Sequence, residues 1–446
     1  MRRLMLVIVI LTVGFSSVAG DRDSSPREQP LTRTLIIAGR LFDSESGTLA
    51  SHQRILVNGS VIEAVGQDVT ARAGTRIIDL SNNTVLPGLI DAHTHLLSEI
   101  PVPERADDEA KARIFAVVHQ GTAYRALRGA ARARSYLRTG ITTVRDLGDA
   151  GWYGDVALKR AIEEGSVEGP RMLVSGPGLS AGTGQFGSLQ KEFLNVAAQE
   201  FTMLNGPAEA ANAVRDHLMN GANLIKLYPL PVELMTSVTQ EVRLLREARL
   251  SFLRTLKVAA HAMVDTQAQR AIMAGVDSIE HGYELSESTL ALMQSKGVFL
   301  VPTDPPEVAF RRRYVNEARR VGQPEVTEAE LVAASRGRRD RLQRAMKAGV
   351  KIAFGSDSYY DYGVPAGDTA LAGLFGYAEA GMLPARMLQS ATRSAAELLG
   401  MEGTVGVIKP GAFADMIAVD GDPLQDVHSL RKIVFVMKNG SVYMGR

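Results

Sequence analysis

The chain has 446 residues, of which 45% are hydrophobic and 22% charged, and it contains no cysteine. This composition is ordinary for a globular protein, and the length allows a large core. The 50 basic and 49 acidic residues nearly cancel, which gives no reason to expect a nucleic-acid or anionic-membrane partner. Without cysteine, disulfides are excluded, and any metal must be bound by histidine, carboxylate or lysine.

The N-terminal segment has the pattern of a secretory signal. Arg2 and Arg3 precede an apolar run over residues 4–13, and small residues follow to Gly20. We predict a signal peptide over residues 1–20 and an exported protein, periplasmic or extracellular. The apolar run is shorter than the roughly 20 residues of a membrane-spanning helix, and an uncleaved anchor is the alternative.

Short strands are predicted near both ends of the chain. Residues 34–37, 54–57 and 76–80 have strand character and are separated by turn residues such as Asn58-Gly59. Segments 415–419 and 433–440 have the same character. We therefore predict that residues 31–84 and 402–446 form one small β-sandwich domain, flanking a central domain over residues 85–401.

The central region repeats one pattern, in which a short strand is followed by a polar loop, a helix and a glycine. Eight strands are predicted, at residues 85–95, 141–147, 171–176, 223–229, 257–263, 278–283, 298–303 and 351–358. This alternation favours a parallel sheet, and eight units favour a closed (β/α)8 TIM barrel over an open doubly wound sheet. No Gly-x-Gly-x-x-Gly follows an early strand, so no dinucleotide site is expected.

Functional side chains of such a barrel lie at the C-terminal ends of its strands. These positions hold four of the eight histidines, a lysine and an aspartate: His93, His95, Lys226, His261, His281 and Asp357. His93 and His95 are two residues apart, so their imidazoles share one face of a strand, as in half of a metal site. The other histidines, which we expect mostly on the surface, are His52, His119, His217 and His428.

Each of these residues also has a simpler interpretation. His261 and His281 could be hydrogen-bonded core histidines, and Lys226 could extend its ammonium to water at a strand end. A metal would repel an ordinary ammonium, which favours a chemically altered or neutral Lys226. Asp357 could cap a helix, but a carboxylate beside a metal is the usual general base.

From Leu35 to Met444 the chain resembles the amidohydrolase superfamily, and most closely its secreted imidazolonepropionase-like, Xaa-Pro dipeptidase (prolidase)-like and ochratoxinase-like branch. The motifs that carry the resemblance are Leu86-Pro-Gly-Leu-Ile-Asp-Ala-His-Thr-His, Gly140-Ile-Thr-Thr-Val-Arg-Asp-Leu-Gly, Ala259-Ala-His-Ala, Ile279-Glu-His-Gly, Gly355-Ser-Asp and Gly411-Ala-Phe-Ala-Asp-Met. Together they are highly specific for the superfamily and less so for the substrate.

The resemblance implies two divalent metal ions, most often zinc. His93, His95 and Asp357 would hold the more buried ion, His261 and His281 the other, and carboxylated Lys226 would bridge them. A hydroxide shared by the ions would be the nucleophile, with Asp357 as general acid and base. Tyr228 would be an oxyanion donor or a packing residue at the rim, and Asp91 would support the ligands from behind. Relatives also assemble into homo-oligomers.

The implied function is hydrolysis of the amide bond of dipeptides or N-acyl amino acids, ochratoxin-type amides included. One departure concerns the loop over residues 180–187, which lacks the histidine that relatives often carry. A mononuclear deaminase or cyclic amidine hydrolase is the alternative, although such relatives tend to lack the lysine and to carry Glu where Ala262-Met263-Val264 stands. A lactonase or phosphotriesterase would use the same two-metal core. A non-enzymatic binding protein should have lost ligands, and none of the six is missing.

Overall fold

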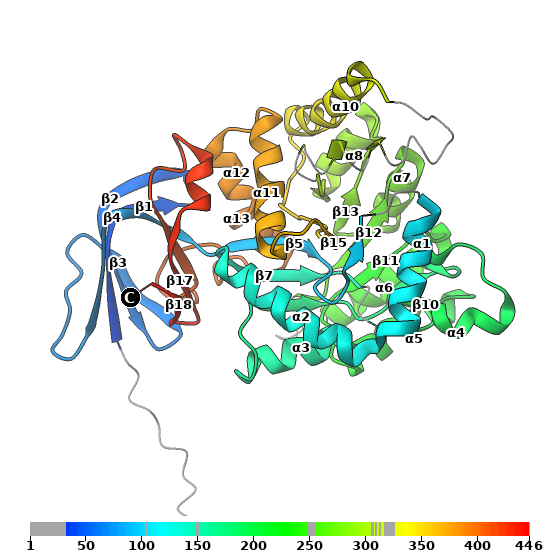
Figure 1. The fold of residues 1–446 in the computed structure, drawn as a ribbon, viewed down its shortest axis with the longest axis horizontal. Coiled ribbons are helices and arrows are strands. Elements are labelled where there is room, and N and C mark those ends of the chain that lie inside the picture. The colour runs from blue at the N-terminus through cyan, green and yellow to red at the C-terminus, as the bar shows by residue number, and fades with distance from the viewer. Residues whose placement is uncertain are drawn as a thin grey trace, which may run out of the picture. The chain divides into compact units, whose positions relative to one another are not determined.

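A computed structural model describes residues 33–102, 106–148, 151–247, 253, 255–304, 307, 310–311, 314–315 and 326–445 (Figure 1). The predicted signal peptide, residues 1–20, lies outside these described residues. Among the helices of the described chain, none combines the length and the apolar character needed to cross a membrane.

Strands from both ends of the chain form one seven-stranded sheet, in the order β18-β17-β16-β4-β1-β2-β3. Their bounds are β1 (Arg33–Asp43), β2 (Thr48–Asn58), β3 (Val61–Gly66), β4 (Arg76–Pro87), β16 (Met416–Val419), β17 (Ile433–Lys438) and β18 (Ser441–Met444). The edge strand β3 also hydrogen-bonds to the segment before β16, with Ile62 N donating to Ala412 O at 2.9 Å. Strands from the two ends of the chain thus share a core that includes Ile36, Ile55 and Phe435, and the predicted joining of the terminal segments is confirmed, as strands of one sheet.

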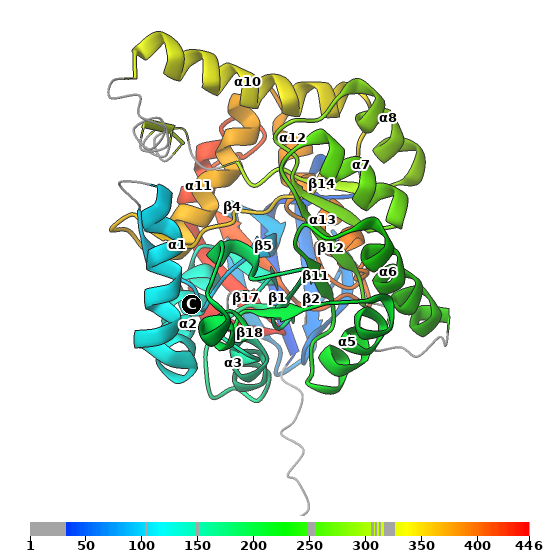
Figure 2. The same cartoon turned by 90° about the vertical axis from the view of Figure 1, so that its right-hand side faces the viewer.

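The central strands run parallel and are separated by helices, as predicted (Figure 2). The strands are β5 (Leu89–Thr94), β7 (Ile141–Asp146), β8 (Arg171–Val174), β11 (Ile225–Leu227), β12 (Val258–Ala262), β13 (Ser278–His281) and β14 (Phe299–Val301). The helices of this region are α2 (Gly121–Arg138), α3 (Gly154–Glu163), α5 (Pro207–Met219), α6 (Val232–Glu247), α7 (Asp265–Ala274), α8 (Glu287–Lys296), α10 (Glu328–Lys347), α11 (Ala366–Glu379), α12 (Pro384–Ser390) and α13 (Arg393–Leu398).

Residues 351–354 close the ring of strands by accepting hydrogen bonds from the strands on either side. Leu300 N on β14 donates to Lys351 O at 2.8 Å, and Ala92 N on β5 donates to Phe354 O at 2.8 Å. The predicted (β/α)8 barrel is therefore confirmed. Gly275 and Gly297 end α7 and α8 with φ of 94° and 68°, the left-handed conformation that glycine adopts without strain.

Two predicted strands differ from the observed ones. The strand predicted over 85–95 is split at Gly88, where an added Cβ would lie 2.1 Å from Thr142 Oγ1. Residues before this glycine complete β4, and those after it form β5. The segment predicted as a strand over 351–358 forms only an isolated bridge, between Ile352 and Leu300, and extended backbone ends at Asp357, whose φ is 50°.

Short elements lie in the loops between these strands and helices. They are β6 (Ile100–Pro101), α1 (Ala106–Phe115), the π-helix η1 (Ala116–Gln120), β9 (Gly178–Ser180), the 3₁₀-helices η2 (Gly184–Phe186) and η3 (Lys191–Phe193), α4 (Leu194–Ala197), β10 (Phe201–Met203), β15 (Tyr360–Asp361) and the 3₁₀-helix η5 (Val427–Arg431). The parallel pair formed by β15 and β6 brings the loops after the first and last barrel strands together.

Candidate functional site

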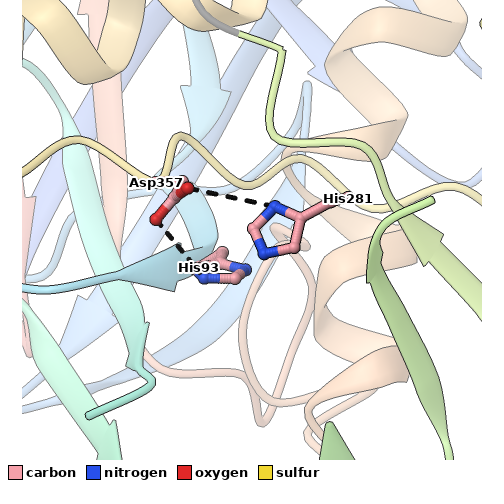
Figure 3. Close-up of side chains that lie close together, drawn as sticks. All are labelled: His93, His281 and Asp357. Atoms are coloured by element: carbon pink, nitrogen blue, oxygen red, sulfur yellow. Dashed lines mark ion pairs between the residues drawn. The ribbon is translucent and has the colours of Figure 1, made fainter. Parts of the chain in front are cut away.

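Three predicted ligands from distant parts of the chain meet at the strand ends (Figure 3). His93, His281 and Asp357 each offer a ligand atom, and these atoms lie within 4.8 Å of one another. Asp357 Oδ1 is 3.5 Å from His93 Nε2 and 3.2 Å from Nε2 of the neighbouring His95. Its other oxygen is 3.9 Å from His281 Nδ1. The carboxylate of Asp357 therefore faces three imidazoles.

The remaining predicted site residues, His261, Tyr228 and Lys226, lie near His281. The ring centroid of His261 is 4.5 Å from that of His281, and the Tyr228 ring stacks on His261 with centroids 5.5 Å apart. Lys226 Nζ lies 5.4 Å from the centre of the Tyr228 ring. Lys226 is only 1% exposed, so its amine does not extend to water. The barrel thus gathers the predicted ligands and Tyr228 in one place.

Burial sets the protonation of these side chains. It lowers the pKa of His93 to about 4 and that of His261 to about 3, and the charge of Lys226 acts in the same direction. Both imidazoles are therefore neutral near pH 7, the form that binds metal ions. Burial alone would raise the pKa of Asp357, but the surrounding histidines, His93 first among them, hold it far below its ordinary value.

The donor set fits a divalent metal ion. Imidazole nitrogens and a carboxylate are ligands that zinc and related ions accept. His93 Nε2 is buried and has no hydrogen-bond partner among the residues that the structure describes, which is costly unless the nitrogen binds something else. Its other ring nitrogen is occupied by a hydrogen bond, so Nε2 is the atom of His93 that faces the cluster.

A buried charge network behind His93 was not predicted from the sequence. Glu280 Oε2 lies 2.7 Å from His93 Nδ1, and Glu280 Oε1 accepts a hydrogen bond from Arg145 Nη2 at 2.8 Å. Arg145 Nε also donates to Ala92 O at 2.6 Å. Glu280 is fully buried and Arg145 is 1% exposed. A glutamate inside a predicted barrel strand was the available signal, since unpaired glutamate is almost never fully buried.

Further contacts hold the rings of His95 and His281, and three residues near them have positive φ. His95 Nδ1 lies 3.0 Å from Gly148 O, and His281 Nδ1 lies 2.8 Å from Thr303 Oγ1. His281, Thr303 and Asp357 all have positive φ, at 71°, 52° and 50°. Such left-handed conformations are uncommon for non-glycine residues and often occur at functional sites.

Two further predictions concern Asp91 and the four histidines outside the cluster. Asp91, expected behind the ligands, is buried, and its Oδ1 accepts hydrogen bonds from His93 N at 3.1 Å and Ser356 N at 2.9 Å. His52, His119 and His428 are exposed as expected. His217 is the exception to this prediction: it is 1% exposed, its ring meets the Tyr153 ring, and its Nδ1 lies 3.0 Å from Ser175 O.

Similar curated proteins include a dihydroorotase and a deaminase. A dihydroorotase from Streptomyces coelicolor is 34% identical over 79 residues, which span 18% of this chain and only 16% of the dihydroorotase. A 5-methylthioadenosine/S-adenosylhomocysteine deaminase from Symbiobacterium thermophilum is 24% identical over 442 residues, covering 90% of each chain.

Solved structures match over most of the chain. A Xaa-Pro dipeptidase with bound methionine is 28% identical, with a TM-score of 0.75 over 93% of this chain and all of that one. The ochratoxinase of A. niger is 25% identical, with a TM-score of 0.73 over 93% of this chain and 96% of that one. The model of the amidohydrolase family matches residues 84–445, which include the barrel and every residue of the histidine cluster. On this match the chain belongs to the amidohydrolase family.

Proposed function

We propose that this protein cleaves the amide bond of dipeptides or N-acyl amino acids, ochratoxin-type amides included, and releases the C-terminal amino acid. The observation that carries the proposal is a buried lysine, Lys226, whose charge acts on three buried, neutral imidazoles, those of His93, His261 and His281. The likeness to a Xaa-Pro dipeptidase and to an ochratoxinase supports this choice of substrate class.

Two divalent ions, which we propose to be Zn²⁺, would be held by this cluster. We assign His93, His95 and Asp357 to one ion, His261 and His281 to the other, and a carboxylated Lys226 to both. Carboxylation would replace a positive charge by a negative one, as a buried amine between two cations requires. When bound, such ions polarise a carbonyl and lower the pKa of water toward about 7.

The residues of the chain supply the proton transfers. Asp357 is ionised at neutral pH, so that it can accept a proton from the attacking water and deliver it to the leaving amine. Tyr228 is 4% exposed and stacks on His261, a position from which its hydroxyl can donate to the oxygen of the polarised carbonyl.

A mononuclear deaminase is the second candidate, favoured by the full-length similarity to a deaminase. Two features of this chain oppose it. Lys226 is present and buried, and no glutamate follows His261, where Ala262, Met263 and Val264 stand. A lactonase or phosphotriesterase would share the two-metal core, and substrate assays separate these activities.

Metal content per chain tests the proposal. Protein purified without chelators should contain close to two equivalents by plasma mass spectrometry, and Lys226→Ala should lose much of this metal. Lys347→Ala, on the exposed surface of α10, is the matched control and should keep it. The loaded enzyme is then assayed on Xaa-Pro and Xaa-Arg dipeptides and on N-acyl amino acids. One equivalent that Lys226→Ala leaves unchanged would refute the bridge and favour the deaminase.

Two properties outside the site complete the proposal. Residues 1–20 have the pattern of a secretory signal, and we propose that the protein is exported. We also propose a homo-oligomer, as in other amidohydrolases. N-terminal sequencing of the exported protein and light scattering test the two statements.

A further inference from the structure

The backbone of His281 forms the centre of a tight turn at the end of β13. Gly282 N donates a hydrogen bond to Glu280 O at 3.0 Å, two residues back, and another to Ala262 O at 2.9 Å. His281 lies between Glu280 and Gly282 with a φ of 71°. A three-residue turn whose central residue has positive φ is rare and strained. Such a conformation persists only where the surrounding structure holds it in place.

An arginine from a distant helix supports this turn. Arg341, on α10, donates a hydrogen bond from Nη1 to His281 O at 2.6 Å, although the two residues are 60 positions apart. Arg341 is 1% exposed and His281 is 5% exposed. A buried carbonyl without a donor is costly, so this bond favours the turn over backbone conformations that aim the carbonyl elsewhere.

The same guanidinium holds the residue that contacts the His281 ring. Arg341 Nη2 lies 2.6 Å from each carboxylate oxygen of Asp304 and donates to this carboxylate. The residue before Asp304 is Thr303, whose Oγ1 lies 2.8 Å from His281 Nδ1 and whose φ is 52°. One side chain therefore fixes the backbone of His281 and also the segment that orients its imidazole.

This double contact goes beyond what an ion pair in the core would need. A buried pair of Arg341 and Asp304 could exist for the fold alone. The bond to His281 O adds nothing to that pair, and it ends on a residue assigned to a metal ion. A guanidinium presents several donors in a fixed plane, so it can bind a carbonyl and a carboxylate together, which a single ammonium does less well.

We propose that Arg341 is a positioning residue, which holds His281 in the conformation that binds the metal ion assigned to His261 and His281. The inference rests on the proposed two-ion site and goes beyond it, because Arg341 itself would touch neither an ion nor the substrate. Loss of Arg341 should therefore weaken one of the two ions selectively. The ion assigned to the other two histidines and Asp357 should bind as before.

Zinc titration of the metal-free protein, by calorimetry in bicarbonate buffer, tests this role. The wild type should bind two equivalents. Arg341→Met should bind the first as tightly as the wild type and the second about 10- to 100-fold more weakly, the usual effect of losing a group that orients a metal ligand. Arg341→Lys should recover only part of this affinity.

Arg344→Met is the matched control on the same helix. Arg344 also joins a carbonyl to a carboxylate, since its Nη1 donates to Leu285 O at 2.7 Å and to Glu287 Oε1 at 3.2 Å. Neither acceptor belongs to a proposed ligand, so both equivalents should bind as in the wild type.

A double variant separates positioning from a general loss of stability. Arg341→Met leaves the Asp304 carboxylate buried without its partner, which by itself is destabilising. Arg341→Met/Asp304→Asn removes both charges, so its urea midpoint should recover while the second zinc stays weakly bound. Recovery of both properties would overturn the inference, and so would a second equivalent that Arg341→Met leaves unchanged.

The metal-free protein gives a readout that does not depend on the number of ions. The nitrogen NMR signals of the His281 ring, assigned with His281→Gln, should shift in Arg341→Met/Asp304→Asn and stay unchanged in Arg344→Met. If the wild type binds fewer than two equivalents, the two-ion proposal fails, and these signals alone decide about Arg341. Ring signals that the double variant leaves unchanged would refute its positioning role.

Discussion

Replacing Glu280 by glutamine should weaken both the fold and the metal site. The carboxylate of Glu280 lies between Arg145 and His93 and has no exposed surface. Burial alone would raise its pKa, yet Arg145 and His93 bring it down to about 2 from an ordinary value of 4.5. That shift corresponds to about 3 kcal/mol of stability. Removing one partner of a buried ion pair costs a similar roughly 3–5 kcal/mol.

The effect on metal binding follows from the His93 ring. With Glu280 ionised, His93 Nδ1 carries the proton and donates it, which leaves Nε2 with a free electron pair for a metal ion. A glutamine amide can donate to Nδ1 instead, and this favours the tautomer with its proton on Nε2. Loss of such a supporting carboxylate typically lowers metal affinity by about 10- to 100-fold.

Urea denaturation and metal titration measure the two effects separately. Glu280→Gln should unfold at lower urea and bind metal more weakly. The double variant Glu280→Leu/Arg145→Met removes both charges, so it should recover stability while metal binding stays weak. The carboxylate's stabilisation is present above about pH 4.5, the ordinary value, and is lost as the pH falls toward about 2. An unchanged urea midpoint and unchanged metal affinity in Glu280→Gln would refute this reasoning.

Three further predictions concern single side chains. Asp357→Asn, assayed with excess metal, should lower kcat by about 10²- to 10⁴-fold, and a retained kcat would remove its acid–base role. Tyr228→Phe should lower kcat by about 10²-fold without changing the urea midpoint, whereas an unchanged kcat would limit Tyr228 to packing. Burial and, to a smaller extent, the negative charge of Asp146 raise the pKa of Asp155 to about 7. The folded protein thus keeps a proton that the unfolded chain releases near pH 4, and the free energy of unfolding should fall from about pH 4 to 7. Asp155→Asn should lack this fall, and a parallel pH profile would contradict it.

The barrel was predictable because its signals are local. Glycines such as Gly275 and Gly297 end helices immediately before strands, and the alternation of strand and helix fixes the parallel arrangement. Five of the six predicted ligands were found from their position at the ends of regular strands, where topology alone brings them together. Asp357 lies in a segment that pairs irregularly and turns with positive φ, which no strand pattern indicates.

Contacts between distant segments were beyond sequence reasoning. Arg145 and Glu280 are 135 residues apart, and either side chain could have paired with another charge. Such distant contacts decide the protonation of buried side chains, as Arg145 and His93 do when they lower the pKa of Glu280.

The order in which the chain is synthesised matters for the terminal sheet. Strand β4 leads through Gly88 directly into β5, which carries His93, and one neighbour of β4 is β16, with Leu86 opposite Ile417. The ribosome therefore makes the first two histidines long before the strand that supports their base. Until β16 has been made, β4 lacks a neighbouring strand on one side, directly before the segment that carries His93.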